Sequence, residues 1–280
     1  MFDKFNILIA GPVYDAEWVT KNAEYYMNQG FYVTISTWDG WEADKLKIPH
    51  VKSSMVHVNG EKIYGFHPGK QEKIESSLYY QCKSVENAFN SGIESTEFCI
   101  KLRTDEFYSD LSQIVFELTT NPTHIVTNNV YLRDQKDIPF SISDHVIGMS
   151  MENMEKTFRS TCFFFDTFRN LIHTEIFPKG IMNKEGQKIN YVRPEQIISK
   201  MFLQNSGVIT PMNDASAETI MQDYATFVDI KHMGEYFISS TKRDIYFSNI
   251  PNINKNLPKV AGNLTKTIKF PRSGKYGISV

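Results

Sequence analysis

The stretch FNILIAGP, residues 5–12, carries the clearest fold signal in this 280-residue chain. Six mainly apolar residues form a compact run, and Gly11 and Pro12 end it at once. A short apolar run with such an ending is typical of a buried strand in a parallel sheet. It is too short for a secretory signal or for a membrane span, which needs about 18–20 apolar residues. We therefore expect a central strand at residues 5–10 and a cytoplasmic chain with no membrane span.

Helical and strand-like segments alternate along the chain after this first strand. Asp15 is placed to cap a helix that Gly30 closes, and apolar residues recur at helical spacing before Gly92. The order implies an α/β fold with a largely parallel sheet and helices on both faces. The predicted helices span residues 15–29, 71–90 and 110–118, and the predicted strands span residues 31–36, 98–102 and 124–127.

The second half of the chain is less regular, and no linker divides it from the first. We expect a single domain over residues 1–280, made of a first half to about residue 130, a second half at 131–248 and a C-terminal arm at 249–280. The segments predicted in the second half are a strand at 141–149 and helices at 151–170, 194–204 and 214–227.

Composition excludes several classes of protein. The formal net charge is −2 and no basic stripe is present, so we expect no nucleic-acid partner. The three cysteines, Cys82, Cys99 and Cys162, lie singly in apolar stretches, which is typical of reduced core thiols and not of a disulfide framework or a zinc site.

Three of the predicted strands end in polar or small residues that differ from ordinary turn signals. Because the carboxyl ends of parallel strands meet at one edge of a sheet, and because ligands bind there in α/β folds, we expect these residues to form a site. They are Gly11 and Pro12 after the first strand, Thr37, Trp38 and Asp39 after the second, and Lys101, Arg103 and Asp105 at the third.

The third of these strand ends carries the most chemistry. Lys101 and Arg103 alternate along the strand, so they share a face and can reach phosphates. Asp105, alone or with Glu106, can hold Mg²⁺ or Mn²⁺ through oxygen ligands. Such cations take up the charge of a departing diphosphate. A surface ion-pair cluster is the alternative interpretation. Asp39 is placed to accept hydrogen bonds from a ribose.

Two further carboxylates are candidates for acid–base chemistry. Asp144, beside His145, lies within an otherwise apolar stretch, where a charge is costly unless it is paired or functional. Glu195 follows Pro194 at a predicted helix start. It can serve as a general base, or it can simply interact with the helix dipole.

Taken in order, these strings resemble the signatures of WavE-type glycosyltransferases, which are associated with lipopolysaccharide and other surface glycans. The resemblance covers about residues 5–202 and implies a GT-A fold, with a nucleotide-sugar donor on the first half and an oligosaccharide or glycoprotein acceptor on the second. The strings that carry it are IAGPV at 9–13, STWDG at 36–40, KLRTD at 101–105, SDHVIG at 143–148 and PEQ at 194–196.

The resemblance also implies roles for particular residues. In GT-A enzymes an Asp-x-Asp motif usually binds the metal, but here the first Asp is replaced by Arg103 and only Asp105 is kept. Whether Mn²⁺ or Mg²⁺ is needed, or whether Lys and Arg replace it, therefore stays open. Glu195 falls where inverting members place the base, with Asp144 the rival at the donor–acceptor junction and His145 a candidate acceptor contact.

The chain is also similar to glycosyltransferases of large algal DNA viruses, which build capsid-protein glycans in the host cytoplasm. The narrowest hypothesis is transfer from UDP-xylose to fucose of a glycoprotein N-glycan. The alternatives are a surface-polysaccharide enzyme with another donor and a nucleotide-sugar- or glycan-binding protein without turnover. A nicotinamide-dependent oxidoreductase is disfavoured because the first turn, GPVYD at residues 11–15, lacks the G-x-G-x-x-G pattern.

Overall fold

The computed structural model describes most of the first 238 residues. Asp39 and the predicted arm at 249–280 lie outside the described residues. Those described are 2–38, 42–53, 64–66, 73–75, 77–130, 132, 135, 139–167, 181–182, 188–189, 194–208 and 216–238.

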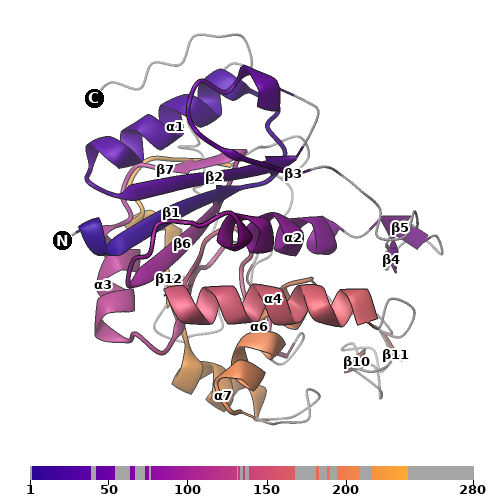
Figure 1. Cartoon of the computed structure of the whole chain (residues 1–280). Coiled ribbons are helices and arrows are strands. Elements are labelled where there is room, and N and C mark those ends of the chain that lie inside the picture. The colour runs from indigo at the N-terminus through magenta and orange to yellow at the C-terminus, as the bar shows by residue number, and fades with distance from the viewer. Residues whose placement is uncertain are drawn as a thin grey trace.

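A seven-stranded sheet forms the centre of the molecule (Figure 1). Neighbouring strands are parallel except at β9, which runs antiparallel to both β6 and β8. The predicted class is confirmed: the fold is α/β and Rossmann-like, with a mostly parallel sheet that becomes mixed in the second half. The strand order is β12 (Ala225–Val228), β8 (Ile125–Asn128), β9 (Ile147–Ser150), β6 (Phe98–Arg103), β1 (Phe5–Ala10), β2 (Tyr32–Trp38) and β3 (Val51–Ser53).

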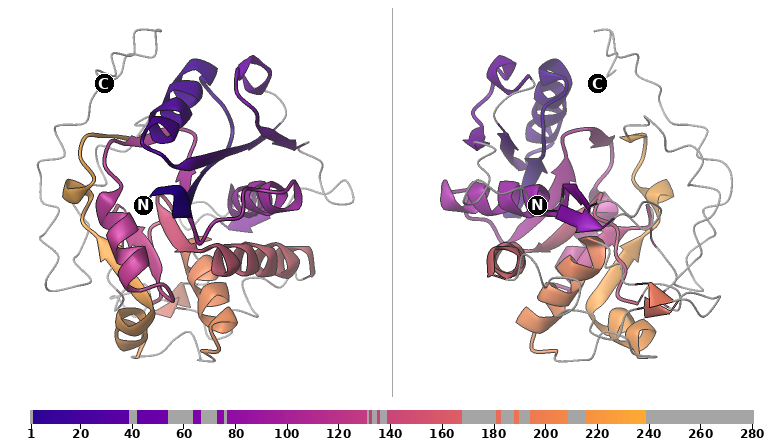
Figure 2. Two further views of the ribbon diagram at one scale, coloured as in Figure 1. Left: turned by 60° about the vertical axis from the view of Figure 1, so that its left-hand side comes forward. Right: turned by 90° about the vertical axis from the view of Figure 1, so that its right-hand side faces the viewer.

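Helices cover both faces of this sheet (Figures 1 and 2). Side chains of β1 alternate between two hydrophobic cores, one on each face of the sheet. Ile7 and Ile9 belong to one core, and Leu8 and Ala10 belong to the other. Since both faces of β1 are buried, its sequence is apolar throughout and not alternating. One face carries α1 (Ala16–Asn28) and α3 (Ser112–Thr120), and the other carries α2 (Ser77–Asn90), α4 (Met151–Thr167), α6 (Pro194–Asn205) and α7 (Ala217–Tyr224).

Smaller elements complete the described chain. Within it, no helix has both the length and the apolar character that crossing a bilayer requires. Three antiparallel pairs are formed by β7 (Glu106–Tyr108) with β13 (Tyr236–Ile238), β4 (Tyr64–Phe66) with β5 (Lys73–Glu75), and β10 (Ile181–Met182) with β11 (Lys188–Ile189), and short 3₁₀ turns lie at Phe2–Lys4, Ala43–Lys45 and Ile230–His232.

Local capping chemistry sets the bounds of α1 as the sequence predicted. The Asp15 carboxylate accepts a hydrogen bond from the backbone N–H of Trp18 at 2.9 Å, which satisfies a donor at the helix start. Gly30, with φ +92°, follows the helix end in the left-handed region that suits glycine.

The helix predicted over residues 71–90 begins too early. Lys73–Glu75 form strand β5, which pairs antiparallel with β4, and α2 starts at Ser77. The hydrogen bonds to β4 complete a local antiparallel pair, and they override the helical spacing of the apolar side chains.

The helix predicted over residues 214–227 is also wrong at its end. Helix α7 stops at Tyr224, and Ala225–Val228 form the edge strand β12, parallel to β8. The ATFV sequence, rich in β-branched and aromatic residues, is the local signal for that strand.

The strand predicted over 141–149 is largely a loop. Only Ile147–Ser150 pair in the sheet, so Ser143, Asp144 and His145 precede β9 instead of lying within a strand. Side chains satisfy the loop in place of a strand ladder: the Ser143 hydroxyl donates to Asn128 Oδ1 at 2.7 Å, and the Ser143 carbonyl accepts from Thr127 Oγ1 at 2.8 Å.

Candidate functional site

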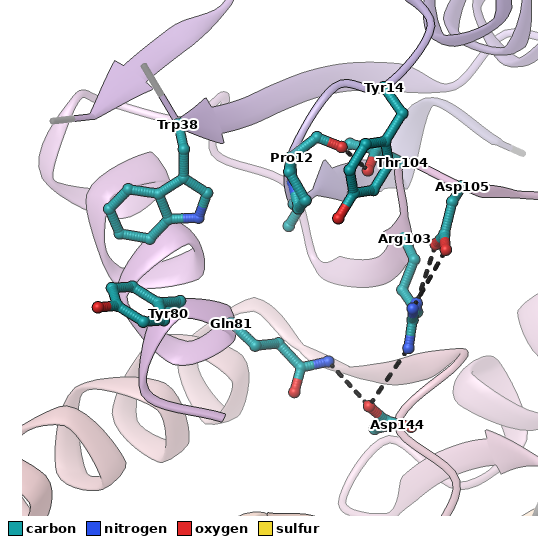
Figure 3. A pocket seen from close by; sticks show the side chains of 11 residues that line it. Pro12, Tyr14, Trp38, Tyr80, Gln81, Arg103, Thr104, Asp105 and Asp144 are labelled. Atoms are coloured by element: carbon teal, nitrogen blue, oxygen red, sulfur yellow. Dashed lines mark hydrogen bonds and ion pairs between the residues drawn. The ribbon is translucent and has the colours of Figure 1, made fainter. Parts of the chain in front are cut away.

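A pocket of about 280 Å³ opens at the carboxyl ends of β1, β2 and β6 (Figure 3). The three strands are adjacent and parallel, so the three strand ends singled out in the sequence meet there, as expected. The lining residues are Ala10, Gly11, Pro12, Tyr14, Trp38, Tyr80, Gln81, Arg103, Thr104, Asp105 and Asp144.

The floor of the pocket depends on a glycine. Gly11 has φ +137°, and a Cβ there would lie 3.1 Å from Thr104 Oγ1. The Gly11 N–H donates to the Ser36 carbonyl at 3.1 Å, and the Thr104 hydroxyl donates to the Pro12 carbonyl at 2.6 Å. The absence of a side chain at Gly11 therefore lets the ends of β1, β2 and β6 close together.

One wall of the pocket is aromatic. The rings of Trp38 and Tyr80 pack edge to face, with centroids 5.5 Å apart and planes at 88°. Trp38 is the last residue of β2, whereas the sequence suggested that the strand ends at residue 36, and Tyr80 comes from α2. The third aromatic residue of the pocket, Tyr14, is 60% exposed and lies beside Thr104, apart from Trp38 and Tyr80 (Figure 3).

The other wall is charged and centres on Arg103. Its Nε and Nη2 atoms donate to the two oxygens of Asp105 at 3.0 and 3.2 Å, a bidentate pair. Its Nη1 atom lies 3.9 Å from Asp144 Oδ2. Gln81 Nε2 donates to the same Asp144 oxygen at 3.2 Å. The guanidinium thus lies between the two carboxylates that line the pocket (Figure 3).

A buried polar cluster supports the charged wall from behind. The Glu106 side chain is fully buried; its Oε1 lies 3.1 Å from Arg103 Nε and 2.5 Å from His145 Nδ1, and its Oε2 accepts from the Tyr108 hydroxyl at 2.9 Å. Asn128 lies beyond Tyr108, with its Nδ2 3.4 Å from the Tyr108 hydroxyl. Such a cluster is tolerated in a core only when its members satisfy one another.

Lys101 also supports the wall and does not line the pocket. It is fully buried, and its Nζ donates to the Asp144 backbone carbonyl at 2.7 Å. Burial lowers the pKa of Lys101 to about 8, although the charge of Asp144 opposes that shift. Its role therefore differs from the predicted phosphate contact: it holds the loop that presents Asp144.

Arg103 and Asp144 each stabilise the charged form of the other. Burial alone would raise the pKa of Asp144, but His145, Arg103 and Lys101 outweigh it and hold that pKa well below its usual range. Burial would likewise lower the pKa of Arg103, but Glu106, Asp105 and Asp144 raise it well above its usual value. Both groups are therefore charged at neutral pH.

The structure brings six of the predicted site residues together around the pocket. Of the others, Asp39 is outside the described residues, and Thr37, Lys101, His145 and Glu195 do not line the pocket. Thr37 is buried within β2, and His145 is buried behind Asp144, where an acceptor would not meet it directly. Glu195 lies in the first turn of α6 and is not among the described residues that line the pocket. The six that line it are Gly11, Pro12, Trp38, Arg103, Asp105 and Asp144.

Sequence reasoning missed Tyr14, Tyr80 and Gln81 as pocket residues, and it placed Glu106 only as a companion metal ligand. Tyr80 and Gln81 lie on α2, whose apolar spacing gives no sign of a ligand. A polar residue directly beside the helix's buried stripe, such as Gln81 next to Cys82, is the one signal that could have pointed there.

The side chains present fit a divalent cation poorly. Both Asp105 oxygens accept from Arg103, and both Glu106 oxygens are engaged in the buried cluster. Over the described part of the chain, no group of three or more His, Cys, Asp and Glu side chains is placed to hold a metal. A cation bound between Asp105 and Asp144 would also face the guanidinium. Arg103 is the cation that the described lining presents to the pocket.

The chain matches no protein-family model and no curated protein. Its solved structural neighbours include a glycosyltransferase involved in the glycosylation of the major capsid of PBCV-1, at 12% identity and a TM-score of 0.41 over 80% of this chain and 82% of that one. An active-site mutant of LgtC gives 12% identity and 0.40 over 60% and 65%. HddC from Yersinia pseudotuberculosis, complexed with GMP-PN, gives 14% and 0.31 over 54% and 78%. Likeness this distant carries no argument about function, which rests on the pocket itself.

Proposed function

We propose that this chain is a glycosyltransferase that moves a sugar from a UDP-sugar to a hydroxyl of a glycan acceptor. The observation that carries the proposal is the pocket at the carboxyl ends of three parallel strands, which joins an aromatic wall to a wall centred on a permanently charged arginine. A nucleotide-sugar needs both: an apolar surface for its base and a cation for its diphosphate.

The two walls suggest how the donor lies. The base packs against Trp38 and Tyr80, and the diphosphate reaches Arg103. The sugar then extends towards Asp144, which lies on the far side of the guanidinium from Asp105 (Figure 3). Gly11, without a side chain, leaves the backbone open to the donor between these two ends.

In the proposed reaction the acceptor hydroxyl oxygen attacks the anomeric carbon of the sugar. The bond from that carbon to the phosphate oxygen breaks, the nucleoside diphosphate leaves with the electron pair, and the hydroxyl proton passes to a carboxylate. One displacement of this kind inverts the anomeric centre. The base must lie within hydrogen-bond reach of the attacking hydroxyl.

Asp144 is the base that we favour over Glu195. It lines the pocket, whereas Glu195 is not among the described lining residues. Glu195 keeps the ordinary role of a first-turn carboxylate at the start of α6. This choice reverses the order that the family resemblance implied.

The finer identities of donor and acceptor rest on the sequence resemblance alone. It supports UDP-xylose as donor and fucose of a glycoprotein N-glycan as acceptor. A surface-polysaccharide enzyme with another donor would use the same pocket. A nucleotide-sugar-binding protein without turnover would need the pocket but no base, and a transfer assay separates it from an enzyme.

A thermal-shift screen of UDP-, GDP- and CMP-sugars, each with and without Mn²⁺, tests the donor assignment. A ligand that binds only the folded chain raises its melting temperature, and we expect the largest rise with a UDP-sugar. Release of free UDP together with a sugar-extended acceptor then demonstrates transfer. If none of the nucleotides shifts the melting temperature, the donor assignment is wrong.

A further inference from the structure

Arg103 is held from behind and engaged from the front by different groups. On the buried side, Glu106 Oε1 lies 3.1 Å from Nε. On the pocket side, Asp105 accepts hydrogen bonds from Nη2 and from the same Nε that faces Glu106. The guanidinium side chain is 26% exposed, Asp105 is 16% exposed and Glu106 is fully buried. The front partner can therefore exchange with solvent or ligand, and the rear partner cannot.

Glu106 is itself fixed, which keeps Arg103 in place when the front partner leaves. His145 and Tyr108 hold its two oxygens, and both side chains are buried. A guanidinium anchored in this way keeps its position at little entropic cost and offers one edge to the pocket. Planar, bidentate anions are the ligands that fit such an edge, and phosphate oxygens have the same spacing as a carboxylate.

In the free protein, the carboxylate of Asp105 occupies the edge of the Arg103 guanidinium that faces the pocket. A carboxylate on this edge competes with a diphosphate for the same donors. Its neighbour Thr104 is tied to the Pro12 carbonyl at 2.6 Å, so the backbone beside Asp105 is fixed and the exchange involves the Asp105 side chain.

We infer that Asp105 is a placeholder anion, and that the donor's diphosphate exchanges for it on the Arg103 guanidinium without a divalent metal. This inference rests on the proposed function and deepens it. The charge of the departing nucleoside diphosphate is then met by Arg103, no proton is transferred to or from the guanidinium, and Asp105 returns to it after release of the product. Asp105 and Arg103 thus form a closed pair in the free protein and an open one in the donor complex.

Calorimetric titration of the full chain with UDP provides the test, performed once in EDTA and once with Mn²⁺ or Mg²⁺. We expect the dissociation constant to agree between the two conditions within about twofold. A rise in affinity of about tenfold or more on adding the metal overturns the inference and leaves the proposed function standing. If UDP, GDP and CMP fail to bind under every condition, the proposed function fails and the inference with it.

The variant Asp105→Asn distinguishes a placeholder anion from a metal ligand, because the two roles predict opposite changes in UDP affinity. Removing the competing charge should tighten UDP binding about three- to tenfold at low salt, because the amide holds the guanidinium less strongly. A metal ligand would behave in the opposite way, and weaker UDP binding by Asp105→Asn overturns the inference.

Arg103→Lys tests the fork itself while keeping the positive charge. We expect about a tenfold loss of UDP affinity, since a lysine offers no bidentate edge. Arg159→Lys is the matched control: Arg159 lies on α4, is 40% exposed and pairs with Glu155 at 2.8 Å. Circular dichroism and melting temperature establish that each variant is folded. Unchanged UDP affinity in folded Arg103→Lys contradicts the inference.

Discussion

The two walls of the pocket are built by different physical means. The aromatic wall consists of Trp38 and Tyr80, whose rings lie against one another, and Tyr80 also packs against the apolar core. The charged wall consists of Arg103, Asp105 and Asp144, and each of its contacts is a hydrogen bond or ion pair to a group that has other partners.

This difference determines how each wall responds to change. Ring packing involves no shared charged partner, so one ring can be replaced by another at modest cost. The charged wall shares its partners, so loss of one group leaves others buried and uncompensated, and the effects of several changes will not add. We therefore expect changes in the charged wall to affect rate and stability as well as affinity, and changes in the aromatic wall to affect affinity alone.

The largest effect is expected at Asp144. Asp144→Asn keeps the shape of the side chain and removes the base, so transfer should slow by about 10²- to 10⁴-fold. Initial rates at saturating donor and acceptor measure this change. Glu195→Gln, made in parallel, should slow transfer far less. The reverse result would return the role of base to Glu195 and remove catalysis from the charged wall.

The next effect is on stability, at the rear of the charged wall. Glu106→Gln removes the anion that Arg103 and His145 share, and breaking a buried pair from one side costs about 3–5 kcal/mol. Urea unfolding measures the change. Glu152→Gln is the control because Glu152 pairs with Lys156 on the exposed side of α4, where we expect no measurable change. Equal stability of the two variants would show that the buried cluster does not hold the wall.

A pH dependence follows from Lys101. Its pKa in the folded chain is about 8, against an ordinary value of 10.5. Between these pH values the unfolded chain keeps a proton that the folded chain has lost, so stability should rise with pH across this window. Relative to Lys101→Met, the wild-type free energy of unfolding should increase by up to about 3 kcal/mol from pH 8 to pH 10.5.

The variant comparison removes the contribution of other groups that titrate in the same range, such as the buried tyrosines. Lys231→Met, at an exposed lysine, should leave the slope of stability against pH as it is in the wild type. If the slope of stability against pH is the same in Lys101→Met as in the wild type, Lys101 does not titrate in this range.

The smallest effect is expected in the aromatic wall. Tyr80→Ala removes a ring that packs against Trp38 and lines the pocket, and loss of one aromatic contact with a base is worth about 1–2 kcal/mol. The KM for the donor should rise by about tenfold with little change in kcat, the signature of lost uniform binding. Tyr80→Phe keeps the ring and serves as the control. A fall in kcat at constant KM would break the distinction between the walls.

Much of the fold could be read from local signals. The apolar run at residues 5–10, the Asp15 cap and the glycine after α1 act through neighbouring residues, so the sequence alone identifies the strand and the helix. The convergence of three strand ends also followed, because it depends only on the strands being adjacent and parallel.

Where the sequence misled, contacts with another segment were responsible, whether that segment is nearby in the chain or far from it. The strand at Lys73–Glu75 needs β4, and the strand at Ala225–Val228 needs β8, although each follows or precedes a helical pattern. The loop that bears Asp144 reads as a strand because its residues are buried; the polar groups that satisfy it belong to Thr127 and Asn128, which no local pattern reveals.

By itself, the sequence determined the α/β class, the edge of the sheet where the pocket lies, and the presence of Arg103 and Asp105 at the end of the third strand. Only the tertiary structure decided that Lys101 turns to the Asp144 carbonyl, that Glu106 lies behind Arg103, and that Tyr80 closes the pocket. The reason is that strand and helix signals depend on residues near one another in the chain, whereas the charge and burial of a site depend on groups that only folding brings into contact.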